Sequence, residues 1–219
     1  MIELILLDGS TVDAPLAEPD RVLAPQEMKR YEKLRSDAGR REFLLGRMLL
    51  KAALTGGNSG CVRDFRMIST TVTATGKPTV AGAEFNLSHD GNAVLLAVGD
   101  QPVGVDIERV QDFDVAMAQI CFTADERHRI SRSLHPDRVA TLLWCMKEAA
   151  AKATGAGLLS ELGKTRKSDL FFRGGFLNVA GVNRAYAVCS TQPISPTNIS
   201  SALPRFERVF ASFQRKVAT

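Results

Sequence analysis

The chain has 219 residues, of which 45% are hydrophobic and 24% charged, so it can bury a core as one large domain or two small ones. Its formal net charge of +4 is too mild for a dedicated nucleic-acid binder. No apolar run approaches the roughly twenty residues of a membrane span, the N-terminus lacks a signal-peptide pattern, and the four cysteines form no Cys-x-x-Cys pair. We therefore expect a reduced, cytoplasmic protein that contacts neither membrane nor nucleic acid.

The N-terminal third combines one strand with two helices. Residues 2–7 have the composition of a strand, and a charged helix is expected from Pro25 to about residue 35. A second helix should reach Leu54, with Asp37 as its N-cap and the glycines at 56 and 57 as its stop.

These two helices carry an excess of positive charge. Residues 21–51 contain nine Lys or Arg against four acids, a local charge of +5 that exceeds that of the whole chain. Arg40, Arg47 and Lys51 fall within one narrow stripe of the second helix. The stretch is suited to a small polyanionic ligand, although a solvated helical face would produce the same pattern.

The middle of the chain contains a hairpin and a strand with two carboxylates. Short β-branched runs at 62–80 precede segments 84–89 and 93–98, which flank the turn Asp90-Gly91-Asn92. Residues 103–109 alternate apolar and polar side chains, so Asp106 and Glu108 project from the same face of one strand.

The C-terminal half repeats the same order of elements. Short helices are expected at 113–120 and 123–133, a long helix from about 137 to 154, and strands at 170–172, 176–179 and 184–190. Because strand, helix and strands occur twice, with a midpoint at 99–102, we predict an α+β protein with two similar halves, residues 1–100 and 101–219.

One face of the long helix presents Trp144, Glu148 and Lys152, opposite the apolar stripe that contains Met146. We expect Trp144 to pack against the other half or against the stem of Lys152. Two carboxylates on a strand, a third on a helix and a nearby lysine would suit a magnesium ion that holds phosphates. Alternatively, the strand carboxylates are solvent-facing, and Glu148 and Lys152 form an ordinary i, i+4 pair.

Five motifs occur in order: TGKP at 75–78, FNLSHDG at 85–91, GVDIE at 104–108, FTADE at 122–126 and WCMKEAAAK at 144–152. Their order and spacing resemble those of 4′-phosphopantetheinyl transferases of the surfactin-synthetase-activating type, over residues 25–152 and more loosely to the C-terminus. The resemblance implies an enzyme that transfers the phosphopantetheine arm of coenzyme A to a serine of an apo acyl or peptidyl carrier protein, with Mg²⁺ and release of 3′,5′-ADP. It also implies two pseudo-symmetric α+β halves with antiparallel sheets and coenzyme A in the cleft between them.

The resemblance assigns catalytic roles to individual residues. Asp106, Glu108 and Glu148 match the family's magnesium ligands, and Lys152 would reach the same pyrophosphate. Either Glu148 directly or Glu126 through a water would take the proton of the carrier serine, and the sequence does not choose between them.

Coenzyme A contacts follow from the same motifs. Ser88 and His89 match residues that contact its phosphates, while Lys77 and Pro78 occupy a turn that contacts phosphate or nucleotide. The N-terminal half would hold the 3′-phosphate through its basic stretch, for which the candidates are Arg30, Arg40, Arg41 and Arg47.

One departure and two alternatives remain at this point. Asp90 stands where a small hydroxylated residue is common after Ser-His, so it would place an anion near the phosphate site or point away from it. Another magnesium-dependent phosphotransferase or a nucleotide-binding protein is the alternative function, although no glycine-rich phosphate loop is present. We expect a monomer, and the sequence does not reveal which carrier protein is modified.

Overall fold

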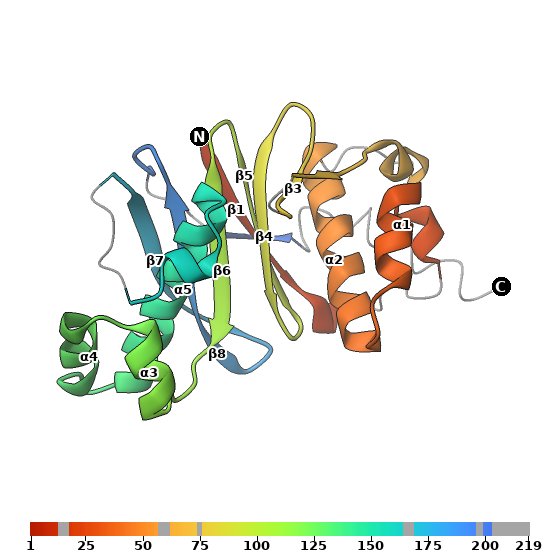
Figure 1. Cartoon of the computed structure of the whole chain (residues 1–219). Helices are drawn as coiled ribbons and strands as arrows, with labels where there is room; N and C mark the ends of the chain where they lie inside the picture. The colour runs from red at the N-terminus through yellow and green to blue at the C-terminus, as the bar shows by residue number, and fades with distance from the viewer. Residues whose placement is uncertain (13–17, 57–61, 74–75, 164–168, 196–198, 203–219) are drawn as a thin grey trace.

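The structure is a computed structural model, which describes residues 1–12, 18–56, 62–73, 76–163, 169–195 and 199–202. Two groups of strands lie side by side, with α1 and α2 on one flank and α3 to α5 on the other (Figure 1). Among the described helices, none is long and apolar enough to cross a membrane. Short 3₁₀ helices lie at Gly9–Thr11, Pro19–Arg21, Val62–Met67 and Leu158–Ser160.

The first sheet has the order β4-β5-β1-β9. Strand β1 pairs antiparallel with β5 and parallel with β9, and β5 pairs antiparallel with β4. The strands span Ile2–Asp8 (β1), Glu84–Asp90 (β4), Ala93–Gly99 (β5) and Ile199–Ser201 (β9). A separate two-stranded ribbon joins Thr71–Val72 (β2) to Pro78–Thr79 (β3).

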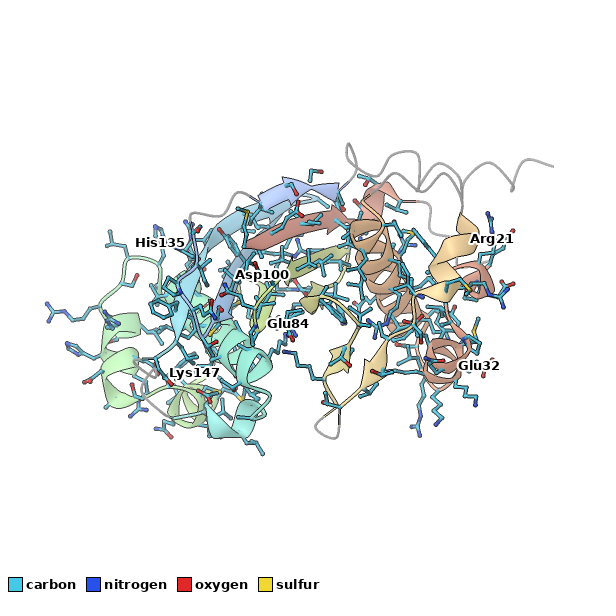
Figure 2. All side chains as sticks on the ribbon, turned by 90° about the horizontal axis from the view of Figure 1, so that it is seen from above. Arg21, Glu32, Glu84, Asp100, His135 and Lys147 are labelled. Atoms are coloured by element: carbon cyan, nitrogen blue, oxygen red, sulfur yellow. The ribbon has the colours of Figure 1, made fainter. Side chains whose placement is uncertain are left out.

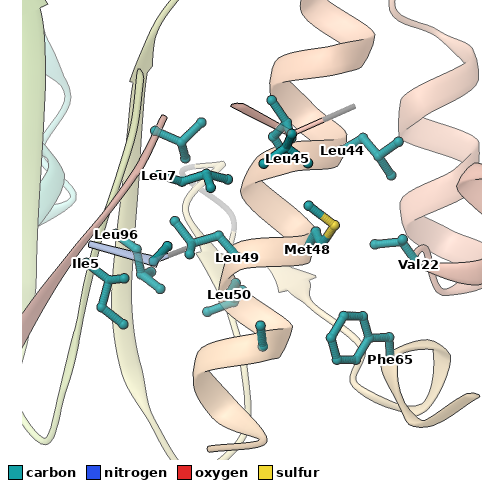
Figure 3. Close-up of a cluster of buried hydrophobic side chains, with 14 of the residues drawn as sticks. Ile5, Leu7, Val22, Leu44, Leu45, Met48, Leu49, Leu50, Phe65 and Leu96 are labelled. Atoms are coloured by element: carbon teal, nitrogen blue, oxygen red, sulfur yellow. The ribbon is translucent and has the colours of Figure 1, made fainter. Parts of the chain in front are cut away.

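Helices α1 (Pro25–Glu32) and α2 (Asp37–Leu54) build the core beside this sheet. Leu45, Met48 and Leu49 of α2 are fully or almost fully buried, and they pack in one cluster with Ile5 and Leu96 of the sheet (Figure 3). The apolar stripe predicted for this helix therefore faces the strands. Its N-cap is Ser36, whose Oγ accepts from the Gly39 amide, so the prediction of Asp37 as the cap is wrong by one residue.

The second sheet has the order β6-β8-β7, all antiparallel, and α5 packs on it. Its elements are β6 (Val103–Arg109), β7 (Phe171–Val179), β8 (Val182–Ser190) and α5 (Pro136–Thr154), with α3 (Val115–Cys121) and α4 (Ala124–Ser131) between β6 and α5. Segments predicted as two strands, 170–172 and 176–179, form the single strand β7. At Gly104 a β-carbon would lie 2.0 Å from the Ala149 carbonyl oxygen, so the backbones of β6 and α5 touch there.

The two halves share one topology. Strand, helix and hairpin follow each other as β1-α2-β4-β5 and as β6-α5-β7-β8, and each hairpin's second strand lies in the middle of its sheet. The prediction of an α+β fold with two pseudo-symmetric halves and antiparallel sheets is therefore confirmed. Strand β9 departs from it, because a segment of the C-terminal half joins the N-terminal sheet.

A common core joins the halves. Apolar residues on the sheet face away from α2, among them Leu4 and Leu95, pack in one cluster with Val105 and Ile107 of β6 and Val188 of β8. The first sheet is thus buried on both faces, which explains the continuous apolar runs of β1 and β5. Viewed from above, Glu84 at the start of β4 lies between Lys147 of α5 and Glu32 of α1 (Figure 2).

Trp144 is placed differently from the prediction. Its ring centroid lies 6.1 Å from that of Phe113, and it belongs to a small cluster with Phe122 beside α3 and α4. It therefore packs within its own half, because the helices between β6 and α5 supply an aromatic partner. Cys121, Cys145 and Cys189 are buried.

Candidate functional site

The site begins where edge strand β4 of the first sheet meets edge strand β6 of the second. Ser88 Oγ donates to Asp106 Oδ1 at 2.8 Å. Lys152 Nζ, from the last turn of α5, donates to the same oxygen at 2.6 Å and to Ser88 Oγ at 3.2 Å. Three side chains from three elements and both halves therefore converge at the buried Asp106.

Two further carboxylates lie close to this group. Glu148 Oε2 is 4.0 Å from Lys152 Nζ. Burial raises the pKa of Glu148, against the opposing effect of the Lys152 ammonium. Burial, and next the carboxylates of Asp106 and Asp90, raise the pKa of Glu108 to about 7. The structure thus concentrates negative charge that one lysine does not neutralise.

These residues fit a hard divalent cation by two criteria. Carboxylate oxygens are the ligands that Mg²⁺ prefers. Asp106 Oδ2 is buried without a hydrogen-bond partner, so one oxygen of this carboxylate is left for a ligand. Within the described residues, no three His, Cys, Asp or Glu side chains converge on one metal position, and Lys152 supplies the positive charge beside Asp106.

A cavity of about 280 Å³ adjoins this group. Its lining combines Lys77 and Pro78 of the ribbon with Asn86 of β4 and with Glu148 and Lys152 of α5. Residues that are up to 76 positions apart in the motifs thus line one surface. Lys77 Nζ lies 4.0 Å from Glu84, so it is held only loosely beside the cavity.

Ser88 and His89 point away from each other, as neighbours on a strand must. Ser88 faces Asp106, whereas His89 Nδ1 lies 3.2 Å from Glu42 of α2. The imidazole is about half exposed, so it is open to solvent on the α2 side of β4.

Two of the four candidate arginines bind backbone carbonyl oxygens of the protein itself. Arg41 donates to the Gly9 and Val12 carbonyl oxygens, and Arg40 donates to the Leu34 carbonyl oxygen while lying 3.6 Å from Asp37. These contacts hold the start of α2 against neighbouring loops.

The predicted basic stripe of α2 is largely buried. Lys51 is 0% exposed, and its ammonium binds the Glu27 carboxylate and the Val22 carbonyl oxygen. Arg47 is also buried and lies 3.3 Å from Glu27. The alternative of a solvated stripe is wrong for these two residues, because both are buried and pair with Glu27 in the first turn of α1.

Arg30 remains as an exposed cation of this patch. It makes no ion pair with the described residues, and its guanidinium lies 5.7 Å from the centroid of the Phe43 ring. With Arg47, Phe43 and Thr70 it lines a second cavity of about 350 Å³. The structure thus separates Arg30 and Arg47, which share a cavity, from Arg40 and Arg41.

Glu126 is held by structural contacts. Its Oε2 accepts from the Thr123 amide at 2.8 Å, which closes a capping box at the start of α4, and lies 3.0 Å from Lys147 Nζ. Glu148 instead lines the cavity beside Lys152.

Sequence reasoning missed two residues near the site. Lys147 forms the buried ion pair with Glu126, and Asn86 Oδ1 accepts from the Val105 amide at 3.0 Å. The polar alternation Asn86, Ser88, Asp90 on β4 was a usable signal for Asn86, since it places all three on one face of the strand. Nothing in the spacing of the sequence pairs Lys147 with Glu126.

Comparison with known proteins gives a consistent result. The model of the 4′-phosphopantetheinyl transferase superfamily matches residues 102–191. A 4′-phosphopantetheinyl transferase of Bacillus subtilis is 32% identical over 163 residues, which cover 68% of this chain and 70% of that protein. A 4′-phosphopantetheinyl transferase of Bacillus pumilus is 43% identical over 88 residues, 38% of either chain. The 4′-phosphopantetheinyl transferase Sfp of Bacillus subtilis is 24% identical over 157 residues, which cover 70% of its length.

Proposed function

The chain belongs to the 4′-phosphopantetheinyl transferase superfamily, and we propose that it moves the phosphopantetheine arm of coenzyme A to a serine of an apo carrier protein at the junction of β4, β6 and α5. The observation that carries the assignment of the site is the convergence of Ser88, Asp106 and Lys152 from both halves, beside Glu108 and Glu148.

Asp106, Glu108 and Glu148 are the residues that would hold Mg²⁺. The unpartnered Asp106 Oδ2 and the raised pKa of Glu108 support this assignment, because a nearby cation favours the ionised form of both carboxylates. When bound, the ion would neutralise charge on the pyrophosphate and orient it for in-line displacement.

Lys152 and the lining of the first cavity would position the pyrophosphate. The Lys152 ammonium already lies between Ser88 and Glu148, so it would neutralise phosphate oxygens that enter this position. Lys77 and Pro78, which line the same cavity, would contact the nucleotide part of coenzyme A.

The carrier serine would attack the β-phosphorus while its hydroxyl proton passes to Glu148, and 3′,5′-ADP would leave. Two observations favour Glu148 over Glu126 for this step. Glu148 lines the cavity beside Lys152, whereas the Glu126 carboxylate is bound by Lys147 and Thr123.

Arg30, with Arg47 behind it, would bind the 3′-phosphate. Arg30 is exposed and makes no ion pair with a described residue, while Arg40 and Arg41 are occupied by backbone carbonyl oxygens. The second cavity gives these two guanidiniums an apolar wall in Phe43, which strengthens their attraction for an anion.

The test is incubation with coenzyme A, Mg²⁺ and apo acyl or peptidyl carrier proteins, followed by mass spectrometry. We expect a phosphopantetheine adduct on a carrier serine with the native chain. Asp106→Ala should slow its formation by roughly 100-fold or more. If no carrier is modified under any condition, the proposed activity is wrong. If Asp106→Ala reacts normally at limiting Mg²⁺, the metal assignment is wrong.

A further inference from the structure

The edges of the two sheets are joined by side chains of alternate residues on β4. Asn86 Oδ1 accepts from the Val105 amide at 3.0 Å, Ser88 Oγ binds Asp106 Oδ1, and Asp90 Oδ2 accepts from the Arg109 amide at 2.9 Å. We call Asn86, Ser88 and Asp90 the β4 clamp. The clamp replaces the backbone ladder that would otherwise join two neighbouring strands, since β4 and β6 belong to separate sheets.

Asp90 carries the largest share of these contacts. Its Oδ1 accepts from Arg109 Nε at 3.2 Å and Nη2 at 3.1 Å, and its Oδ2 accepts from Arg184 Nε at 3.1 Å. Arg184 also donates to the Asp90 carbonyl oxygen. Because Arg109 ends β6 and Arg184 lies opposite it on β8, one carboxylate holds two strands of the second half.

Arg184 requires a carboxylate at position 90. Its side chain is 4% exposed, and Nη1 donates to the Val179 carbonyl oxygen at 2.9 Å. A buried guanidinium needs a paired carboxylate, and Asp90 is that partner. The aspartate that departs from the usual residue after Ser-His therefore has a partner of its own in this chain.

The clamp brackets the carboxylates of β6. Asn86 holds the residue before Asp106, and Asp90 holds the residue after Glu108. Ile107, between the two carboxylates, is locked in the shared core. We propose that Asp90 and Asn86 are positioning residues that set the register of Asp106 and Glu108 against Ser88 and α5. This role rests on the proposed function of the carboxylates as magnesium ligands.

A purely structural role is the competing explanation, since any residue that joins the halves adds stability. Positioning makes an additional prediction. A change in the clamp should lower the affinity for the metal and the turnover by more than an equal loss of stability elsewhere would. The reason is that residues bound to metal ligands orient those ligands.

The experiment compares Asp90→Ala, Asp90→Asn and Asn86→Ala with Phe65→Leu, which creates a cavity in the core beside α2, away from β6. Amide exchange at Arg109 and Val105 is followed by NMR. Binding of Mn²⁺ in the presence of coenzyme A is measured by calorimetry, and kcat, KM and melting temperature are measured on the same samples.

We expect Asp90→Ala to speed exchange of the Arg109 amide by roughly tenfold and leave Val105 less affected, with the reverse pattern for Asn86→Ala. Affinity for Mn²⁺ should fall by about tenfold or more in Asp90→Ala, and kcat should fall more than KM rises. Asp90→Asn should retain much of the protection at Arg109, because its amide oxygen still accepts. If Asp90→Ala proves unstable, Asp90→Asn and Asn86→Ala give the same comparison.

Two results would overturn the proposal. Unchanged exchange at both amides would show that the clamp hydrogen bonds do not form. Mn²⁺ affinity and kcat that fall no further than in Phe65→Leu would reduce the clamp to a structural element. The exchange measurement needs neither coenzyme A nor a carrier, so it separates failure of the clamp from failure of the transferase assignment.

Discussion

Lys152 is the side chain on which the charge balance of the site depends. Its nearest carboxylate oxygen is Asp106 Oδ1 at 2.6 Å, whereas Glu148 in the adjacent turn lies at 4.0 Å. The spacing of the sequence indicated the second contact and could not indicate the first. The lysine therefore links α5 to β6, in addition to its i, i+4 contact with Glu148 within the helix.

Replacing Lys152 by alanine should lower turnover by about 100-fold and weaken coenzyme A binding, because the proposed donor to the pyrophosphate is lost. The ammonium also lowers the pKa of Glu108, so its removal should shift the pH–rate profile upward. Lys152→Arg, which keeps the charge, is the control. Near-normal turnover with a slightly lower melting temperature would limit Lys152 to a structural pair.

Glu108 predicts a dependence of stability on pH. Its pKa of about 7 in the folded protein exceeds the ordinary value of 4.5, so between these values the folded state binds the extra proton. Stability of the metal-free protein should therefore fall as pH rises from about 4.5 to 7 and level off above. Melting temperatures of the native chain and Glu108→Gln, measured across this range, should show the slope reduced in the variant. If the melting temperatures of the two proteins change equally with pH, Glu108 is not the source of the pH dependence.

At the scale of elements, the contact of β6 with α5 decides where Glu148 and Lys152 lie. Gly104 permits this contact, because its absent β-carbon would fall 2.0 Å from the Ala149 carbonyl oxygen and 2.4 Å from the Ala153 amide nitrogen. The atoms in the way belong to a helix backbone and cannot move aside without moving the helix.

Gly104→Ala should destabilise the fold by about 1–3 kcal/mol or more and displace Glu148 and Lys152, whose proposed roles predict that activity falls even where the protein stays folded. Gly46→Ala is the matched control. A β-carbon at Gly46 would lie 3.6 Å from the Leu87 side chain, an ordinary van der Waals contact. Because Gly46 lies inside α2, alanine is favoured over glycine there by roughly 1 kcal/mol. Denaturant unfolding of both variants measures the change in the free energy of unfolding, which should be negative for Gly104→Ala and positive for Gly46→Ala. A neutral Gly104→Ala would contradict the close approach.

Elements whose signals are local were predictable. The end of α2 at Leu54 and the range Val103–Arg109 of β6 were predicted correctly, because an apolar stripe, a turn and an alternating pattern define them within their own residues, whereas the start of α2 was predicted one residue too late. Strand β7 was predicted as two pieces, since Gly174 and Gly175 interrupt the apolar pattern. The structure explains Gly174: a β-carbon there would lie 2.6 Å from the Tyr186 carbonyl oxygen of the adjacent strand.

The interior of the site was less predictable. That Asp106 and Glu108 share a face follows from strand geometry alone. That Glu27 pairs with Arg47 and Lys51, or that Asp90 pairs with Arg109 and Arg184, depends on how separate elements pack. The roles of Arg30, Lys77, Ser88, His89 and the other site residues stay predictions.

At the scale of the whole molecule, a ligand that reaches both cavities must contact both halves. The first cavity is lined by the β2–β3 ribbon, β4 and α5, and the second by α1, α2 and Thr70 to Val72. Coenzyme A, with its pyrophosphate at one and its 3′-phosphate at the other, would tie the halves together.

Dephospho-coenzyme A should bind more weakly than coenzyme A by about 1.5–3 kcal/mol, because charge-assisted hydrogen bonds to the 3′-phosphate are lost. Arg30→Ala should abolish most of this difference while changing dephospho-coenzyme A binding little. Calorimetry with the two ligands and two proteins closes this thermodynamic cycle. If the native chain binds both ligands with equal affinity, the cavity with Arg30 does not bind the 3′-phosphate.

Strand β9 has a consequence for how the chain acquires its structure during synthesis. Three strands of the first sheet, β1, β4 and β5, lie within the first hundred residues and can pair early. Leu4 meets its parallel neighbour Ile199 only after nearly all of the described chain has left the ribosome, and Leu4 also waits for Val105 and Ile107 to cover its side of the sheet. The nascent first half therefore exposes an apolar sheet face until β6 has been made and an open edge of β1 until β9 has been made, and chaperones would protect it from aggregation in these intervals.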